Sequence, residues 1–384
     1  MAPTKVAVIG VGMSAKVFHI PFILSYPDLF SLEVIVERSA TPTSSKARDL
    51  YPGVTVVNTL EQALAEDIDA VWILAPNAEH YAYSKAVLEA GKHVVIEKPV
   101  TPTSAEAYEL AELAKSKSLV LAVYQNRRWD ADFLTVKDLI AKGTFGELSD
   151  FQSNLSVDGT LTSAYHATQF DRYKNELNVK VWKESNIPGA GAAFDLGSHL
   201  VDQLLDLFGA PQRVTGLVRN SRQLGDPAVP DSFVIQLHYP ADPSTPGRSL
   251  PLLATAQGSI LSLVTPQMRY TVRGTKASFV KHGVDVQESQ LIAGGKDALA
   301  KDGFAVEPSE QAGVLYRLEN PSKPETITSH PGSYRSWFEN VGAALQARDP
   351  SQLIVQPEQA ALVIKVLELA AQSSQEGRTL DLVV

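Results

Sequence analysis

The sequence predicts an α/β protein: a doubly wound parallel sheet at the N-terminus, followed by an α+β domain with an antiparallel or mixed sheet. Three observations support this. Buried strand-like runs alternate with helical segments over the first 125 residues, a glycine-rich turn follows the first run, and several short strand-like runs follow residue 210. At 384 residues the chain is long enough for two domains. We place them at residues 1–125 and 126–384, because the composition changes near residue 125.

The composition limits the possible partners. The hydrophobic fraction is 44% and the net charge is −9, which fits a globular protein and disfavours a nucleic-acid partner. The absence of cysteine excludes disulfides, cysteine-based zinc sites and thiol catalysis. The first strand starts by Lys5 and no apolar run approaches about 20 residues, so we expect neither a signal peptide nor a membrane partner. The chain is therefore expected to be cytoplasmic.

The first strand-like run, residues 5–9, leads into a G-x-G-x-x-A pattern. The first glycine would allow the tight turn, the second would let the backbone approach a pyrophosphate, and the alanine would let the helix pack close to the strand. The phosphates would lie on free N–H groups at the helix N-terminus. The alternative is a purely structural turn. We predict contacts with a dinucleotide from Gly10, Gly12, Met13, Ser14 and Ala15.

The second strand, Leu32–Val36, is followed by Glu37, Arg38 and Ser39. An acidic residue at this point can accept a hydrogen bond from the ribose 2′-OH of NAD, and an arginine can hold the 2′-phosphate of NADP. Glu37 would repel that phosphate if it pointed inward, whereas Arg38 and Ser39 would bind it. The alternative is a surface pair that contacts nothing. We predict that NADP is favoured over NAD.

Polar residues also follow the later strands of this domain, at the sheet edge where open α/β sheets bind ligands. These strands are Ala70–Ala75, Val94–Ile96 and Leu119–Val123. Asn77 could instead cap a helix, His80 could lie on the surface, and residues 124–130 could be a domain junction. The Lys98–Pro99 bond is a candidate for the cis form. Further cofactor contacts are expected from Ala75, Pro76, Asn77, His80, Glu97, Lys98, Asn126 and Arg127.

The second half of the chain is less regular. Strand-like runs are found at 147–157, 212–220, 231–239, 251–273 and 276–281, and helical patterns at 132–142, 333–347 and 357–374. The last helix has an apolar side and must dock on something, so it could pack back on the N-terminal domain. Residues 158–190 predict a long loop, and residues 282–330 show no clear period.

A second candidate site lies at residues 189–202. Asp195 and His199 are four residues apart, so on a helix they would share one face, with Asp202 near it. A histidine beside a carboxylate can act as a general acid or base. The alternatives are a helix-surface pair or a core histidine hydrogen-bonded to its aspartate. Three suitable ligands for a metal are not evident, so no metal is expected.

Together, the glycine-rich turn, Glu97-Lys98-Pro99 and Asp195-x-x-x-His199 resemble the Gfo/Idh/MocA oxidoreductases over nearly the whole chain. Residues 125–130, 170–173, 195–203 and 285–288 resemble one branch of that family. The resemblance implies a Rossmann domain followed by a large open-faced mixed sheet. In the family this sheet commonly forms the oligomer interface, so a homodimer or higher homo-oligomer is expected.

The resemblance also implies an activity and a site. Lys98, Asp195 and His199 would meet in a cleft, where Lys98 polarises the reacting oxygen, His199 acts as acid or base and Asp195 orients the substrate or the imidazole. The expected reaction moves a hydride between NAD(P) and a sugar, a polyol or a related small molecule. A non-catalytic dinucleotide-binding regulator and a reductase or dihydrodiol dehydrogenase for a non-sugar compound remain alternatives. Substrate contacts are expected from Lys98, Trp129, Arg172, Trp182, Asp195 and His199.

Overall fold

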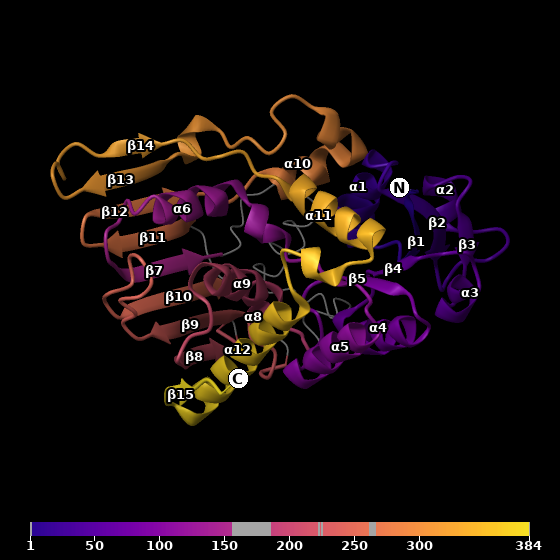
Figure 1. The fold of residues 1–384 in the computed structure, drawn as a ribbon, viewed down its shortest axis with the longest axis horizontal. Coiled ribbons are helices and arrows are strands. Elements are labelled where there is room, and N and C mark those ends of the chain that lie inside the picture. Colours follow the sequence, from indigo (N-terminus) through magenta and orange to yellow (C-terminus); the bar gives the residue numbers. More distant parts are fainter. Residues whose placement is uncertain (1, 156–185, 222, 224–225, 261–265, 384) are drawn as a thin grey trace. The chain divides into compact units, whose positions relative to one another are not determined.

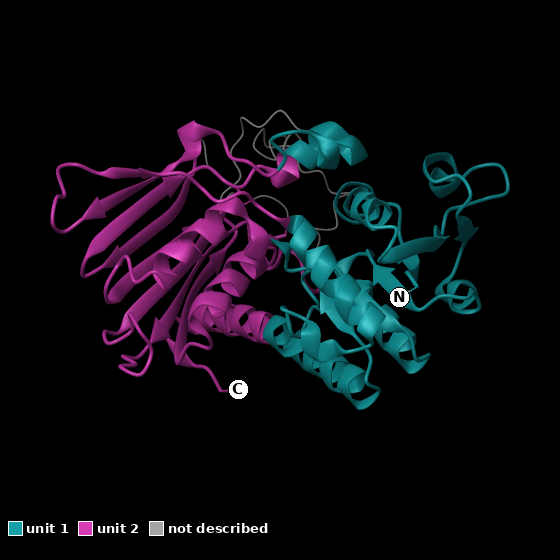
Figure 2. Ribbon diagram, turned by 45° about the horizontal axis from the view of Figure 1, so that its top comes forward, with its two compact units in different colours: residues 1–126, 290–304, 334–361 teal, residues 127–289, 305–333, 362–384 magenta. Residues whose placement is uncertain are grey.

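The computed structural model describes residues 2–155, 186–221, 223, 226–260 and 266–383. The chain forms two compact units (Figure 2). The first comprises residues 1–126, 290–304 and 334–361, and the second comprises residues 127–289, 305–333 and 362–384. Neither unit is continuous in sequence, because two late segments of the chain belong to the first.

The first unit contains a six-stranded parallel sheet with the order β3-β2-β1-β4-β5-β6, which confirms the doubly wound prediction (Figure 1). The strand order reverses between β1 and β4. All residues of β4 and β5 are buried, as expected for a sheet covered on both faces. The short strand β3 had not been anticipated. The strands are β1 (Thr4–Ile9), β2 (Phe30–Val36), β3 (Thr55–Val57), β4 (Ala70–Ile73), β5 (His93–Ile96) and β6 (Leu121–Val123).

The helices of this unit begin at recognisable signals. Thr59 and Thr103 each form a capping box, with Gln62 and Glu106 respectively. From the late part of the chain, α11 packs Trp337 and Phe338 among aromatic rings of the first unit. The elements are η1 (Ala15–His19), α1 (Ile20–Ser25), α2 (Lys46–Leu50), α3 (Leu60–Leu64), η2 (Asn77–Glu79), α4 (His80–Glu89), α5 (Ser104–Ser116), η5 (Gly295–Ala300), α11 (Tyr334–Ala347) and η7 (Pro350–Gln352).

The second unit contains a nine-stranded sheet with the order β14-β13-β12-β11-β7-β10-β9-β8-β15. Only the β7–β10 pairing among the described strands is parallel, so the sheet is mixed, as predicted. The strands are β7 (Leu148–Asn154), β8 (Arg213–Arg219), β9 (Ser232–Tyr239), β10 (Leu252–Ser259), β11 (Met268–Gly274), β12 (Ala277–His282), β13 (Gly313–Arg317), β14 (Glu325–Ile327) and β15 (Leu380–Asp381).

Two sequence expectations for this unit need correction. The run at 251–273 is two strands, β10 and β11, because the apolar pattern continued across their boundary. The patternless stretch 282–330 contains one complete helix, two short 3₁₀ turns and the strands β13 and β14. None of these elements is longer than eight residues, so none gave a clear period. The remaining helical elements are η3 (Asn126–Trp129), α6 (Ala131–Ala141), α8 (Ala192–Asp195), α9 (Gly197–Phe208), α10 (Gln287–Gly294), η6 (Ser309–Gln311) and α12 (Pro357–Glu376).

The apolar helix near the C-terminus docks on β8. A Cβ added at Gly216 would lie 1.9 Å from the carbonyl oxygen of Ala370, so only glycine permits this approach. Ser373 and Ser374 accept hydrogen bonds from the backbone N–H groups of Gly216 and Val218, each at 2.9 Å. These contacts fix α12 against a strand near the sheet edge.

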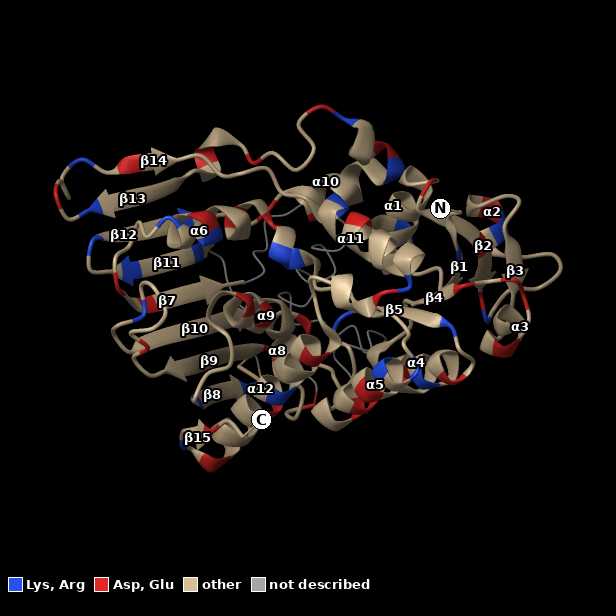
Figure 3. Cartoon of the chain, in the orientation of Figure 1, with Lys and Arg blue, Asp and Glu red and all other residues tan. Residues whose placement is uncertain are grey.

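Charged residues of both signs are found on the described elements of each unit. Acidic and basic positions are interspersed along the helices and strand ends of each unit (Figure 3). No helix in the described part of the chain is long and apolar enough to cross a membrane.

Candidate active site

The glycine-rich turn follows β1, at the point where the strand order of the first sheet reverses. Gly10 has φ +99°, and a Cβ there would lie 3.0 Å from the carbonyl oxygen of Leu74. A Cβ added at Gly12 would meet nothing within 4 Å, so open space lies beside this backbone. Crowding at the first glycine and free approach at the second are the features a pyrophosphate site requires. The turn therefore fits the dinucleotide that its sequence predicts.

The element after this turn is a π-helical turn, η1, and its geometry joins the turn to the end of β5. Ser14 Oγ and His19 Nε2 both hydrogen-bond to Oε1 of Glu97, the latter at 2.9 Å. Ser14 immediately precedes η1 and His19 is its last residue, so both ends of this turn are tied to one carboxylate oxygen. The pairing was not predicted, because Glu97 lies 83 and 78 residues away from its two donors.

The Glu97 carboxylate is thus an acceptor for three donors, the third being the backbone N–H of Lys98 at 3.0 Å. His19 is fully buried and packs against Tyr124, Trp337 and Phe338. Burial acts to raise the pKa of Glu97, but the hydrogen bond and charge of His19, with Ser14 and Lys98, lower it to about 2. Glu97 therefore stays ionised and holds the glycine-rich turn against the backbone of Lys98.

The Lys98–Pro99 peptide bond is cis, which confirms that prediction. His80 does not lie on the surface. Its ring is fully buried between two backbone oxygens, with Nδ1 at 2.9 Å from Pro99 O and Nε2 at 2.9 Å from Ala75 O. It joins the segment after β4 to the segment after β5. Of the remaining predicted contacts in this region, Asn77 is buried, and Ala75, Pro76 and Lys98 are half-buried.

At the end of β2, Glu37 and Arg38 point to different partners. The buried carboxylate of Glu37 accepts hydrogen bonds from Ser45 Oγ (2.7 Å), Ala47 N (3.0 Å) and Lys46 N (3.1 Å) at the start of α2. Burial acts to raise the pKa of Glu37, but these hydrogen bonds outweigh it and hold the pKa below its ordinary value. The side chain of Arg38 is 64% exposed and pairs with Glu79 at 2.7 Å. Ser39 beside it is exposed.

In the second unit, the expected single helix carrying Asp195 and His199 is interrupted. Asp195 ends α8, and α9 starts at Gly197, so the four-residue spacing does not by itself place the two side chains on one continuous helix face. His199 lies in the first turn of α9 and is 6% exposed. Asp202 binds Arg128 with both carboxylate oxygens, at 2.7 and 2.9 Å. This partner of Asp202 was not predicted, because Arg128 lies 74 residues earlier in the chain.

The cluster at 126–130 is held mostly by backbone and ionic contacts. Arg127 pairs with Asp130 at 3.2 Å and with Glu288. Trp129 and Asn126 are each 7% exposed. The predicted substrate contacts Arg172 and Trp182 lie outside the described residues. No group of His, Asp and Glu within the described ranges is arranged to hold a metal ion.

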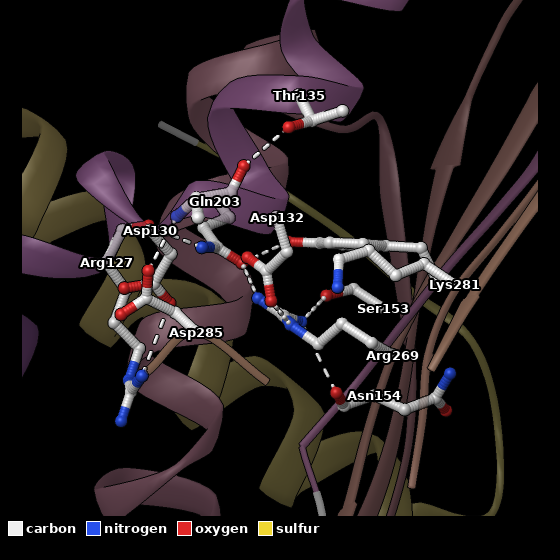
Figure 4. Close-up of polar contacts among 12 residues, drawn as sticks. Arg127, Asp130, Asp132, Thr135, Ser153, Asn154, Gln203, Arg269, Lys281 and Asp285 are labelled. Carbon is white, nitrogen blue, oxygen red and sulfur yellow. Dashed lines mark hydrogen bonds and ion pairs between the residues drawn. The ribbon is translucent and has the colours of Figure 1, made fainter. Parts of the chain in front are cut away.

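Several buried polar residues near this cluster were missed from sequence. Asp132 pairs with Arg269 at 2.8 Å, and Arg269 also donates to Ser153 and Gln203 (Figure 4). Each is separated from its partners by more than sixty residues, so no local signal could have identified the contacts.

Comparison with known proteins agrees with this geometry. Residues 4–125 match the model of an oxidoreductase family described as an NAD-binding Rossmann fold, and residues 137–382 match that family's C-terminal alpha/beta domain. An uncharacterized oxidoreductase of Schizosaccharomyces pombe is 41% identical, with both chains covered completely. The scyllo-inositol 2-dehydrogenase (NADP(+)) IolW of Bacillus subtilis is 34% identical, over 98% of this chain and 96% of its own.

Solved structures agree over the full length. The Bacillus subtilis oxidoreductase yvaA superposes with a TM-score of 0.80 at 32% identity, covering 100% of this chain and 99% of its own. The Yersinia pestis oxidoreductase YPO2259 gives 0.82 at 29% identity, over 100% and 98% of the two chains. Both family models therefore match this chain, the Rossmann domain first and the C-terminal domain second, and the solved structures share its fold. The chain belongs to the Gfo/Idh/MocA family of NAD(P)-dependent oxidoreductases.

Proposed function

We propose that this protein transfers a hydride between NADP and a ring-bearing polyol or sugar, oxidising a secondary hydroxyl group or reducing the matching carbonyl. The observation that carries the proposal is the full-length similarity to a relative named as an NADP-dependent scyllo-inositol dehydrogenase. Two shorter matches, at 26% and 28% identity over about half of the chain, are named D-glucoside 3-dehydrogenase and a dTDP-sugar 3-reductase. All three names describe chemistry at a ring carbon bearing oxygen.

The preference for NADP is supported by the end of β2. The carboxylate of Glu37 already accepts hydrogen bonds from three donors of its own chain, so about three of its four acceptor sites are occupied before a ribose 2′-OH could bind. Arg38 presents an exposed guanidinium whose ion pair with Glu79 is solvent-accessible and weak. A 2′-phosphate carries more charge than a carboxylate and can displace it.

In the proposed reaction the cofactor supplies or accepts the hydride. The ammonium group of Lys98 donates to the substrate oxygen and stabilises the charge that develops there. His199 removes the hydroxyl proton in oxidation and returns it in reduction, and Asp195 orients the substrate or the imidazole. Glu97 holds the backbone of Lys98 beside the glycine-rich turn through its three hydrogen bonds.

The test is a panel of inositols, aldoses and glucosides assayed with NADP and NAD, and of ketoses and non-sugar carbonyls assayed with NADPH and NADH. Turnover is followed by the absorbance of the reduced nicotinamide. We expect turnover of at least one cyclic polyol with NADP. His199→Ala should lower kcat by about 10²–10⁴-fold, the usual contribution of a positioned acid/base. The exposed His330→Ala variant, in the same unit, is the control. If His199→Ala keeps full turnover per folded molecule and only melts earlier, the histidine is structural.

A panel without turnover, combined with tight dinucleotide binding, would favour the alternative of a non-catalytic regulator. Turnover confined to non-sugar carbonyls would instead identify a reductase of another class. Both outcomes would overturn the polyol assignment.

We also propose that the protein forms a homo-oligomer through the open face of the second sheet. Strands β9 and β10 alternate between buried and partly exposed positions, so one face of the sheet is less covered. That face presents Val234, Leu253 and Thr255, and the neighbouring strand adds the exposed Leu217. Light scattering should give a dimer or larger, and Leu217→Lys with Leu253→Lys should shift it to monomer. A monomeric wild type would end this proposal.

A further inference from the structure

Three sequence segments that no local pattern connects meet in one buried polar cluster of the second unit. They are residues 127–131, the helix α9 and residues 285–288. Arg128 binds Asp202, Arg127 pairs with Glu288, and the backbone N–H of Ala131 donates to Asp285 at 2.7 Å. We call this set the motif cluster. Its further members are Trp129, Asp206, Gln203 and Gln287. Figure 4 shows part of it.

The centre of the motif cluster is the pair of Arg128 and Asp202, whose side chains are only 3% and 2% exposed. A buried ion pair is weak evidence for a role in stability, because a well-packed apolar pair is often as stable or more so. The ion pair does provide geometric specificity, because two parallel hydrogen bonds restrict the orientation of the two side chains relative to each other. We therefore consider a role in orienting α9 and not a role in stability.

Gln203 adds a second fixed contact on the same helix. Its Nε2 donates to the carbonyl oxygen of Arg127 at 2.6 Å, and its Oε1 accepts from Arg269 Nη2 at 2.8 Å and from Tyr270 Oη at 3.0 Å. Both polar atoms of this amide are thus occupied, and the residue is 1% exposed. It fastens α9 to β11 on one side and to η3 on the other.

Four of the polar residues of α9 share one face. Residues 199, 202, 203 and 206 follow the spacing i, i+3, i+4 and i+7, which places them along one stripe of an α-helix. His199 is at the N-terminal end of this stripe, one turn before Asp202 and Gln203. Because the stripe is fixed by two directional contacts, the rotation of α9 about its axis is fixed, and so is the direction of residue 199.

We propose that Arg128, Asp202 and Gln203 are positioning residues for His199, setting the rotation of α9 that the acid/base step requires. The proposal rests on the function proposed above, because only an acid/base role for His199 requires its side chain to be held in one orientation. It predicts that removing the ion pair while keeping the packing will impair turnover but not cofactor binding.

The decisive variant is Arg128→Met with Asp202→Leu, which replaces the ion pair by an apolar pair of similar size. Asp206 keeps Lys137 as its partner at 2.6 Å, so no isolated buried charge is left. We expect the melting temperature to stay within about 4 °C of wild type. We expect kcat to fall at least about tenfold, with the KM for NADP within about twofold, because a small misplacement of a catalytic group is costly.

Two further variants separate placement from stability. Arg128→Lys keeps the charge but not the two-pronged geometry, so it should not restore kcat. Lys142→Met with Asp138→Leu removes a partly exposed ion pair at the C-terminal end of α6 and should leave kcat unchanged. Wild-type kcat in the Arg128→Met, Asp202→Leu protein, or restoration by Arg128→Lys, would overturn the proposal.

A measurement independent of turnover distinguishes this proposal from the proposed function. The imidazole Cε1–H resonance of His199, identified by its loss in His199→Ala, should shift in the Arg128→Met, Asp202→Leu protein and stay fixed in the α6 control. If wild type neither oxidises nor reduces any compound in the panel, the proposed function fails while this resonance still decides the positioning role. An unchanged resonance would refute that role directly.

Discussion

Replacing Glu97 by glutamine is expected to change how the stability of the first unit depends on pH. The carboxylate of Glu97 accepts hydrogen bonds from Ser14, His19 and the backbone of Lys98. A glutamine keeps one acceptor oxygen but offers a donor where the second oxygen faced the N–H of Lys98. The variant therefore loses the charge and at least one of the three contacts.

The magnitude follows from the pKa of Glu97, which is lowered from 4.5 to about 2 in the folded protein. At about 1.4 kcal/mol for each pH unit, this difference contributes about 3 kcal/mol to the free energy of unfolding at neutral pH. Because the folded-state pKa is the lower one, the contribution is complete above about pH 4.5 and is lost as the pH falls toward 2. About 2 kcal/mol of it should have disappeared by pH 3.

The assay is urea unfolding of wild type and Glu97→Gln between pH 7 and pH 3, followed by tryptophan fluorescence, since Trp72 and Trp337 are buried in the first unit. The stability difference between the two proteins should be largest at neutral pH and shrink as the pH falls. The exposed Glu89→Gln, on α4 of the same unit, should show no such convergence. A Glu97→Gln deficit that is independent of pH would refute the reasoning.

Three further outcomes are expected. Arg38→Ala should weaken NADP binding by about 1–3 kcal/mol and spare NAD, as measured by fluorescence titration with both cofactors; equal losses for both would show that Arg38 does not contact the 2′-phosphate. Gly216→Ala should destabilise the protein by about 1–3 kcal/mol in urea unfolding, because its Cβ would overlap the backbone of Ala370 in α12. Gly12→Ala should leave the unfolding midpoint unchanged, since its Cβ meets nothing within 4 Å, yet weaken dinucleotide binding; unaltered affinity would argue against phosphate contact at this turn.

The fold class could be predicted because it depends on local patterns. Buried runs such as those of β4 and β5 reveal strands, and their alternation with helices reveals the parallel sheet. The short strand β3 and the strands β13 and β14 escaped prediction. A three-residue strand such as β3 has no measurable period and is stabilised by its neighbour in the sheet, not by its own sequence.

The candidate site was predicted in part. Residues at the ends of parallel strands must gather at one edge, so the glycine-rich turn and residues 97–98 could be grouped from sequence alone. The helix expected for Asp195 and His199 is divided at Leu196, where the backbone keeps right-handed helical angles (φ −95°, ψ −41°); spacing alone does not reveal such a division. The direction of Glu37 was likewise undetermined by sequence, since it depends on whether the free N–H groups of α2 lie within reach.

By itself, then, the sequence determined the order of the two domains, the glycine-rich turn and the residue types available for hydride-transfer chemistry. Only the tertiary structure decided which polar groups are paired with one another. Ser14 and Glu97 are 83 residues apart, Arg128 and Asp202 are 74 apart, and Arg127 and Glu288 are 161 apart. A buried charge needs a partner of opposite charge or a hydrogen bond, but this need does not determine which residue becomes the partner. The partner is chosen by the packing of whole helices and strands, which brings distant backbones within the reach of a side chain.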